Sequence, residues 1–193
     1  MGTDKARLAV GASTVLERTV GVLTAVVEPV LVVAAAGQVL PPLPVDVLRD
    51  ELAGTGPLHA LAVGLTEAAR RGADAALVTA TDLPLLRQEL LRVLLANAEP
   101  GLLVLPVVDG REQLLLAVWP TALAAPAHAA VAAGSRRVRD LLVLTAVRRL
   151  DAAALLSDAE LAAVDPGLRC MQGANTPAEW AQLVGEQPVG DAH

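Results

Sequence analysis

An aspartate stands where an apolar run of the sequence ends and a loop begins. Asp82 follows the run 75–79 and precedes Pro84, so it lies just beyond a predicted buried strand. A carboxylate at that position is a hard oxygen ligand of the kind that Mg²⁺ prefers, and Mg²⁺ usually joins one or two carboxylates to substrate phosphates. The alternative is an aspartate that only opens a turn before the proline.

A second candidate region combines a carboxylate with glycines that lead into a helix. Asp50 is followed by Gly54 and Gly56, which precede a helix predicted over 57–71. Glycines before a helix N-terminus let the backbone approach a ligand, and the free N–H groups there favour an anion or a polar ring edge. Gly-x-Gly-Pro is also common turn chemistry, so a simple turn is the alternative.

The basic residues are almost all arginine, because the only lysine among the 15 basic residues is Lys5. Lysine offers phosphate a compact point charge, whereas arginine offers a flat fork, so Lys5 is a candidate phosphate contact or a chance surface charge. Arg137, in the run Arg-Arg-Val-Arg, is a candidate clamp for a second anionic substrate or a solvated helix start. Asn175 either caps a following helix or reaches a ligand.

The elements that must position these residues alternate between apolar strands and helices. The predicted strands are 30–34, 44–48, 75–79, 102–107, 113–119 and 146–150. The predicted helices are 13–27 (capped by Ser13), 57–71, 85–98, 120–133, 137–144, two short ones within 152–164, and 176–184. This order predicts an α/β fold with a mainly parallel sheet covered on both faces and one antiparallel excursion at 102–119. Ligands bind at the carboxyl ends of the strands in such sheets, which is where Asp50 and Asp82 fall.

Composition narrows the class of protein. The length of 193 residues suits one domain, which we place at 1–184, with a flexible C-terminal tail at 185–193. The net charge of -6 and the absence of Phe and Tyr argue against nucleic-acid binding. Pro and Gly break the apolar stretch 19–48 into pieces too short to cross a membrane. The charged N-terminus and the single Cys170, expected in the core, favour the cytoplasm.

Taken together, the motifs follow one another in a recognisable order. That order is MG-x-DKA, R-D at a strand end, G-x-GPL, D-x-P, DGR-x-Q, RRVR and NTP-x-E. It resembles that of the bacterial molybdenum cofactor guanylyltransferases, nucleotidyltransferases with a Rossmann-like three-layer α/β/α fold, and the resemblance covers essentially the whole chain. It implies transfer of GMP from GTP to molybdopterin carrying molybdenum, with Mg²⁺ as cofactor and pyrophosphate as the released product.

The resemblance also implies a role for each candidate residue. Asp82 matches the aspartate that contacts Mg²⁺ and GTP, and Lys5 matches the lysine at the nucleotide phosphates, so these two would carry catalysis. The remaining residues would bind the two substrates: the nucleotide through Asp50, Gly54 and Gly56, and molybdopterin through Arg137 and Asn175. Transfer of CMP to the same cofactor is the alternative reaction, although the GPL motif favours guanylyl transfer.

The sequence departs from the family at three places. The family begins with a strand and a loop of the form LAGG-x-S-x-R before MG-x-DKA, whereas this sequence begins at that methionine. We therefore expect the first, central strand of the sheet to be missing and its two neighbours to lack a partner. In addition, Gly173 stands where the family usually has asparagine. The segment 33–37 lacks a polar residue, so nucleotide recognition there would rely on backbone groups or be weaker.

Two hypotheses explain the missing start. The preferred one is a start codon assigned too late, and the other is a truncated paralogue that is inactive or serves only to bind. Genomic DNA upstream of Met1 that encodes an apolar strand and then Gly-Gly-x-Ser-x-Arg would support the first; the absence of such a frame would contradict it.

Overall fold

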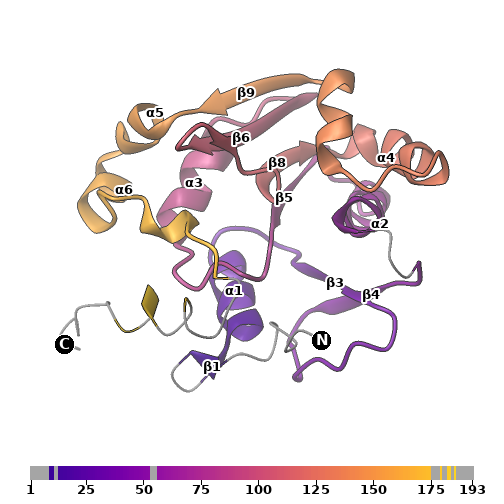
Figure 1. Cartoon of the computed structure of the whole chain (residues 1–193), viewed down its shortest axis with the longest axis horizontal. Coiled ribbons are helices and arrows are strands. Elements are labelled where there is room, and N and C mark those ends of the chain that lie inside the picture. Colours follow the sequence, from indigo (N-terminus) through magenta and orange to yellow (C-terminus); the bar gives the residue numbers. More distant parts are fainter. Residues whose placement is uncertain are drawn as a thin grey trace.

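The computed structural model describes residues 9–10, 13–52, 56–174, 179, 182–183 and 185. Strands and helices alternate along them, which confirms the α/β class (Figure 1). The strands are β1 (Ala9–Val10), β2 (Ser13–Thr14), β3 (Leu31–Ala35), β4 (Asp46–Asp50), β5 (Ala75–Thr79), β6 (Leu102–Val108), β7 (Arg111–Glu112), β8 (Leu116–Pro120) and β9 (Ala146–Leu150). The α-helices are α1 (Val15–Thr24), α2 (Pro57–Arg70), α3 (Gln88–Ala96), α4 (Ala124–Ala132), α5 (Ala152–Leu156) and α6 (Ala159–Val164). The 3-10 helices among the described residues are η2 (Thr121–Leu123), η3 (Val138–Leu144) and η4 (Arg169–Met171).

The larger sheet has the strand order β5-β8-β6-β9, with the short β7 paired to the end of β6. β8 is antiparallel to both β5 and β6, and β6 is parallel to β9. It follows that β5, β6 and β9 share one direction and that β8 is reversed between them. The prediction of a mainly parallel sheet with an antiparallel excursion within 102–119 is confirmed for this sheet.

A second sheet consists of β3 and β4, which are parallel and paired from Leu31 opposite Asp46 to Ala35 opposite Asp50. Within the described part of the chain, β3 pairs only with β4 and β5 pairs only with β8, so each has one paired edge. Figure 1 shows β3 and β4 as a group of their own beside the larger sheet.

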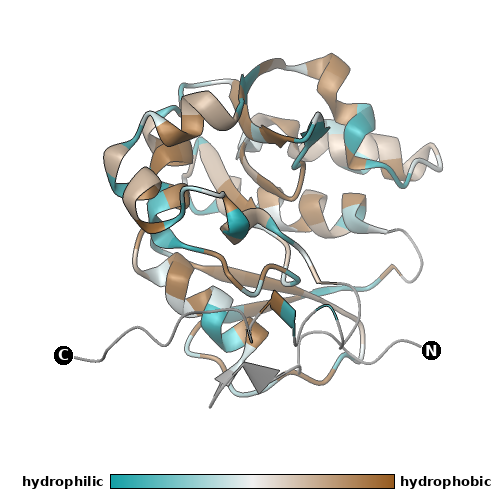
Figure 2. Cartoon of the chain, turned by 60° about the vertical axis from the view of Figure 1, so that its left-hand side comes forward, coloured by the Kyte–Doolittle hydropathy of each residue, from teal (hydrophilic) through white to brown (hydrophobic). Residues whose placement is uncertain are grey.

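Helices cover both faces of the larger sheet, because alternate side chains of its strands enter different cores. Leu103 and Leu105 of β6 and Trp119 of β8 pack in one core with α2, α4 and η3. Val104 and Val118 pack in the other core with α3, α5 and α6. Figure 2 shows the apolar colour continuing along the strands between the helices. The three-layer arrangement is thus built from aliphatic residues and one buried tryptophan.

Two element boundaries near the site differ from prediction. Thr14 rather than Ser13 caps α1: its hydroxyl accepts the N–H of Glu17 at 3.2 Å, and the Glu17 carboxylate accepts the N–H of Thr14 at 2.7 Å, which completes a capping box. The strand predicted at 44–48 lies two residues later, because its pairing with β3 runs to Asp50. Asp50 is therefore the last residue of β4 and does not lie beyond it.

Other boundaries shift without changing the layers. The helix predicted over 85–98 is shortened to α3, and the strand predicted over 113–119 begins only at Leu116 after a turn closed by the Leu116 N–H on the Gln113 carbonyl at 3.0 Å. The helix predicted over 120–133 is η2 followed by α4, and that over 137–144 is a 3-10 helix. The predicted helix 176–184 and the predicted tail 185–193 lie largely outside the described residues. In the described part of the chain, no helix has the length and apolarity needed to span a bilayer.

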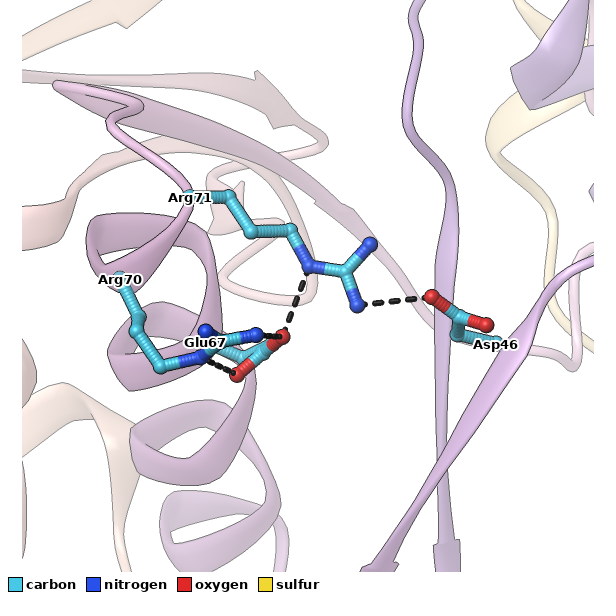
Figure 3. Close-up of polar contacts among 4 residues, drawn as sticks. All are labelled: Asp46, Glu67, Arg70 and Arg71. Carbon is cyan, nitrogen blue, oxygen red and sulfur yellow. Dashed lines mark hydrogen bonds and ion pairs between the residues drawn. The ribbon is translucent and has the colours of Figure 1, made fainter.

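A charged network ties the end of α2 to the start of β4 (Figure 3). The Glu67 carboxylate accepts from the guanidinium groups of Arg70 and Arg71 at 2.7 Å. Arg71 also donates to Asp46 at 2.7 Å. The smaller sheet is thereby linked to the helix that packs on both sheets.

The network makes part of the stability dependent on pH. Hydrogen bonds from Arg70 and then Arg71 lower the pKa of Glu67 from 4.5 to about 2. A carboxylate whose pKa is lowered by folding stabilises the fold above its unfolded pKa and loses that effect as the pH falls through the folded value. We expect Glu67→Gln to lower the melting temperature slightly at pH 7, and the difference from wild type to vanish between about pH 4.5 and pH 2.

Thermal melts of both proteins across this pH range check the expectation. Glu160→Gln is the control, since the ion pair of Glu160 with Arg92 is long, at 3.9 Å. A difference for Glu67→Gln that stays constant down to pH 2 would contradict the network's contribution.

Candidate functional site

Asp50 is fixed at the carboxyl end of β4 by both its backbone and its side chain. Its carbonyl accepts the N–H of Ala36 at 2.9 Å. Its Oδ1 accepts the N–H of Leu52 at 3.0 Å and lies 2.5 Å from Nδ1 of His59. The carboxylate is only 12% exposed. The sequence therefore places this acidic group correctly at a strand end, but the histidine that contacts it was not among the predicted site residues.

Gly56 precedes α2 in a conformation that only glycine adopts easily. Its φ is +69°, and a Cβ at this position would lie 3.2 Å from the backbone oxygen of Arg136. Among the residues that the structure describes, no side chain caps the N-terminus of α2. The glycine thus allows the start of α2 to approach the segment that carries Arg136 and Arg137, which lies far away in the sequence.

The arginines of the Arg-Arg-Val-Arg run have different surroundings. Arg139 pairs with Oε2 of Glu112 at 2.7 Å, and Arg149 pairs with Oε1 of the same carboxylate at 2.8 Å. Arg136 and Arg137 are exposed, and neither forms an ion pair with a described residue. Arg139 therefore helps to hold η3 against β7 and β9. Arg136 and Arg137 expose their side chains from a segment whose backbone meets Gly56.

Asp82 lies in the loop that follows β5, and its side chain is half-buried. Its backbone oxygen accepts the N–H of Ala174 at 3.0 Å. A Cβ on Gly173 would lie 3.9 Å from Oδ2 of Asp82. The two residues that precede Asn175 are therefore beside Asp82, which connects two motifs from opposite halves of the sequence.

The acidic groups suit a metal that is shared with a substrate. Among the described residues, no group of three or more His, Cys, Asp or Glu could hold an ion. Mg²⁺ bound through one or two carboxylates and substrate phosphates needs no such group, so Asp82 fits this mode of binding.

Cys170 is a core residue, as expected. It is 1% exposed, and its N–H donates to Asp165 at 2.8 Å. Burial first, and then the neighbouring Asp165 carboxylate, raise the pKa of the thiol far above its usual range. The side chain therefore stays protonated and is no nucleophile.

A shallow depression of about 510 Å³ adjoins the other face of β4. Val47, Arg49 and Glu51 line it together with the loop 36–41. These side chains alternate along β4 with that of Asp50, so they point away from the Asp50 carboxylate. Gln38 supplies a polar group after β3, but its Oε1 accepts the N–H of Ala35 at 3.3 Å within its own turn.

Comparison with known families decides the class of protein. A family model described as the MobA-like NTP transferase domain matches residues 1–153. The chain belongs to the MobA-like NTP transferase family. It is accordingly a nucleotidyltransferase.

Two curated relatives of this MobA-like transferase come from mycobacteria, and both carry the name probable molybdenum cofactor guanylyltransferase. The protein of Mycobacterium marinum is 46% identical over 144 residues, which are 73% of this chain and 72% of the relative. The protein of Mycobacterium avium is 45% identical over 146 residues, which are 74% of each. The resemblance read from the motif order is thereby confirmed.

Solved structures confirm the fold. Molybdopterin-guanine dinucleotide biosynthesis protein A from Archaeoglobus fulgidus superposes with a TM-score of 0.70 at 17% identity, covering 95% of this chain and 90% of that one. The 2-C-methyl-D-erythritol 4-phosphate cytidylyltransferase from Thermus thermophilus superposes with a TM-score of 0.69 at 19% identity, covering 94% and 92%. The Rossmann-like nucleotidyltransferase fold of the MobA-like chain is shared by both.

The structure of the MobA-like chain locates four of the predicted site residues. Asp50 and Gly56 lie close to the start of α2, Arg137 follows Arg136, whose backbone meets Gly56, and Asp82 lies beside the segment that leads to Asn175. The other predicted residues, Lys5, Gly54 and Asn175, fall outside the described residues. The sequence signal for the missed His59 was its position two residues after Pro57, in the first turn of a helix that begins near Asp50.

Proposed function

We propose that this chain transfers GMP from GTP to molybdopterin carrying molybdenum, with Mg²⁺ as cofactor, and releases pyrophosphate. Its curated mycobacterial relatives are named as probable molybdenum cofactor guanylyltransferases. The observation that carries the proposal is that Asp50, Gly56 and the backbone of Arg136 meet at the start of α2, with Arg136 and Arg137 exposed. This region therefore holds an acceptor for polar N–H or O–H groups, and the segment that meets it carries two arginines that can donate to phosphate.

In the proposed reaction, a phosphate oxygen of molybdopterin attacks the α-phosphorus of GTP. The new P–O bond replaces the bond to the leaving pyrophosphate, so no further reactant is required. Such a reaction depends mainly on positioning two anions and neutralising charge. Bound Mg²⁺ would supply charge neutralisation at the phosphates, and Asp82 is the residue that would hold it.

The protein's own residues would position the two substrates. Asp50 and the glycines Gly54 and Gly56 would hold the nucleoside part of GTP, with Lys5 at its phosphates. Arg137 and Asn175 would hold molybdopterin. The exposed Arg137 guanidinium has the shape to bind a phosphate through two parallel hydrogen bonds.

The test is pyrophosphate release by the purified chain with molybdenum-loaded molybdopterin. We expect release with GTP and Mg²⁺, and none with CTP or after chelation of Mg²⁺. Release with CTP alone would assign the alternative CMP transfer. If the chain neither releases pyrophosphate nor binds GTP–Mg²⁺, the result would favour an inactive or binding-only protein. A cytoplasmic location, where GTP is available, stays a prediction.

A further inference from the structure

A histidine that the proposed function does not use contacts Asp50. Nδ1 of His59 lies 2.5 Å from Oδ1 of Asp50. The two side chains are 10% and 12% exposed, so the pair is largely shielded from water. Because a carboxylate oxygen can only accept, Nδ1 carries the proton and donates it.

The imidazole of His59 is itself held in place. It projects from the first turn of α2, and its ring meets that of His128 on α4 edge to face, with centroids 5.7 Å apart. Nε2 of His128 lies 3.1 Å from the hydroxyl of Thr66, and this hydroxyl donates to the carbonyl of Ala62 at 2.8 Å. A row of side chains therefore connects Asp50 to the packed interface of α2 and α4.

These contacts use one oxygen of the carboxylate and leave the other. Oδ1 of Asp50 takes both the Leu52 N–H and the His59 Nδ1–H, while Oδ2 has no hydrogen-bond partner among the described residues. We propose that His59 is a positioning residue that fixes the Asp50 carboxylate with Oδ2 presented to an N–H or O–H group of the bound nucleotide. This inference rests on the proposed function, which puts the nucleotide beside Asp50.

A histidine that only fills space would behave differently from one that positions a carboxylate. His59→Leu fills much of the same space with an apolar side chain but removes the hydrogen-bond donor to Asp50. His59→Asn is smaller but places an amide N–H near the former Nδ1. If the hydrogen-bond donor matters, the asparagine variant binds the nucleotide like wild type. If side-chain volume matters, the leucine variant does so instead.

The experiment measures binding of GTP and of CTP, each with Mg²⁺, by isothermal titration calorimetry on the full chain. We expect His59→Leu to weaken GTP binding about tenfold to a hundredfold, the loss typical of a hydrogen bond to a charged group. His59→Asn should bind within about threefold of wild type on the same grounds. In an Asp50→Ala background, His59→Leu should cause no further loss, because the histidine acts through the carboxylate.

His128→Phe is the matched control, since it removes the neighbouring imidazole nitrogens but keeps an aromatic ring against His59 and leaves the Asp50 contact in place. It should bind GTP as wild type does. If His59→Leu fails to fold by circular dichroism, His59→Gln replaces it, because its longer side chain cannot put a donor at the position of Nδ1.

The outcomes separate the two proposals. Two results would overturn the role of His59 and leave the proposed function standing. One is GTP binding by His59→Leu at wild-type strength, and the other is an equally large loss of GTP affinity when His59→Leu is added to Asp50→Ala. The wild-type protein could instead bind CTP and not GTP, with CTP affinity lost in His59→Leu and kept in His59→Asn. That result supports the role of His59 and overturns GTP as the proposed nucleotide. Wild-type protein that binds neither nucleotide overturns both.

Discussion

Asp82→Ala is expected to slow GMP transfer by about a hundredfold to a thousandfold, the loss typical when a group that stabilises transition-state charge is removed. The carboxylate stands beyond the carboxyl end of β5 beside the segment that leads to Asn175. Without it, Mg²⁺ at the phosphates would lose its protein ligand. Single-turnover rates with saturating GTP and Mg²⁺ measure the effect. Asp82→Asn, which keeps the shape but not the charge, should lose nearly as much activity.

The fold should survive this change. The Asp82 main-chain oxygen, which accepts the Ala174 N–H, is present in any variant at this position. Asp74→Asn is the matched control, because it removes the same charge from an exposed residue just before the opposite end of the same strand. It should retain full activity. Normal turnover by Asp82→Ala would refute the assignment of Asp82.

Gly56→Ala is expected to destabilise the protein by about 1–3 kcal/mol, because a residue with a side chain is strained at positive φ. Its Cβ would also press on the Arg136 backbone oxygen from 3.2 Å, so the segment before η3 or the start of α2 must move. We expect weaker GTP binding as a result. Thermal unfolding and calorimetric titration with GTP and Mg²⁺ measure the two effects.

Gly72→Ala separates strain from displacement. Gly72 follows the other end of α2 with a φ of +85°, and its Cβ would meet nothing within 4 Å. This variant should lose comparable stability but bind GTP like wild type. The close approach of Gly56 and Arg136 would have no bearing on the nucleotide if both variants bound it equally well.

Local sequence signals sufficed for several elements of the fold. The apolar runs 75–79 and 146–150 became β5 and β9 without a shift, and the helix after Gly56-Pro57 begins where predicted. Pro, Gly and the change of hydrophobic period mark these boundaries locally. β4 was misplaced by two residues because its end is set by pairing with β3, an interaction between separate segments.

The candidate site followed the same division. Asp50 and Asp82 could be placed at strand ends because the position of a residue after an apolar run is a local property. The contact of Gly56 with Arg136 could not be predicted, since it depends on how α2 packs against the segment before η3. Nor could the sequence distinguish Arg137 from Arg139, because Glu112, which neutralises only the latter, comes from a separate strand.

The separation of the two sheets affects how the carboxylates can move relative to each other. Asp50 belongs to the β3–β4 sheet and Asp82 follows the larger one, and no backbone hydrogen bond joins the described residues of the two sheets. α2 packs against β3, β4 and β5, and a Cβ on its Gly64 would lie 3.5 Å from Val33. Packed side chains slide past one another more readily than strands joined by hydrogen bonds. The distance between the Asp50 and Asp82 carboxylates can therefore change more easily than a distance within one sheet. A ligand that contacted both carboxylates would fix the distance between them.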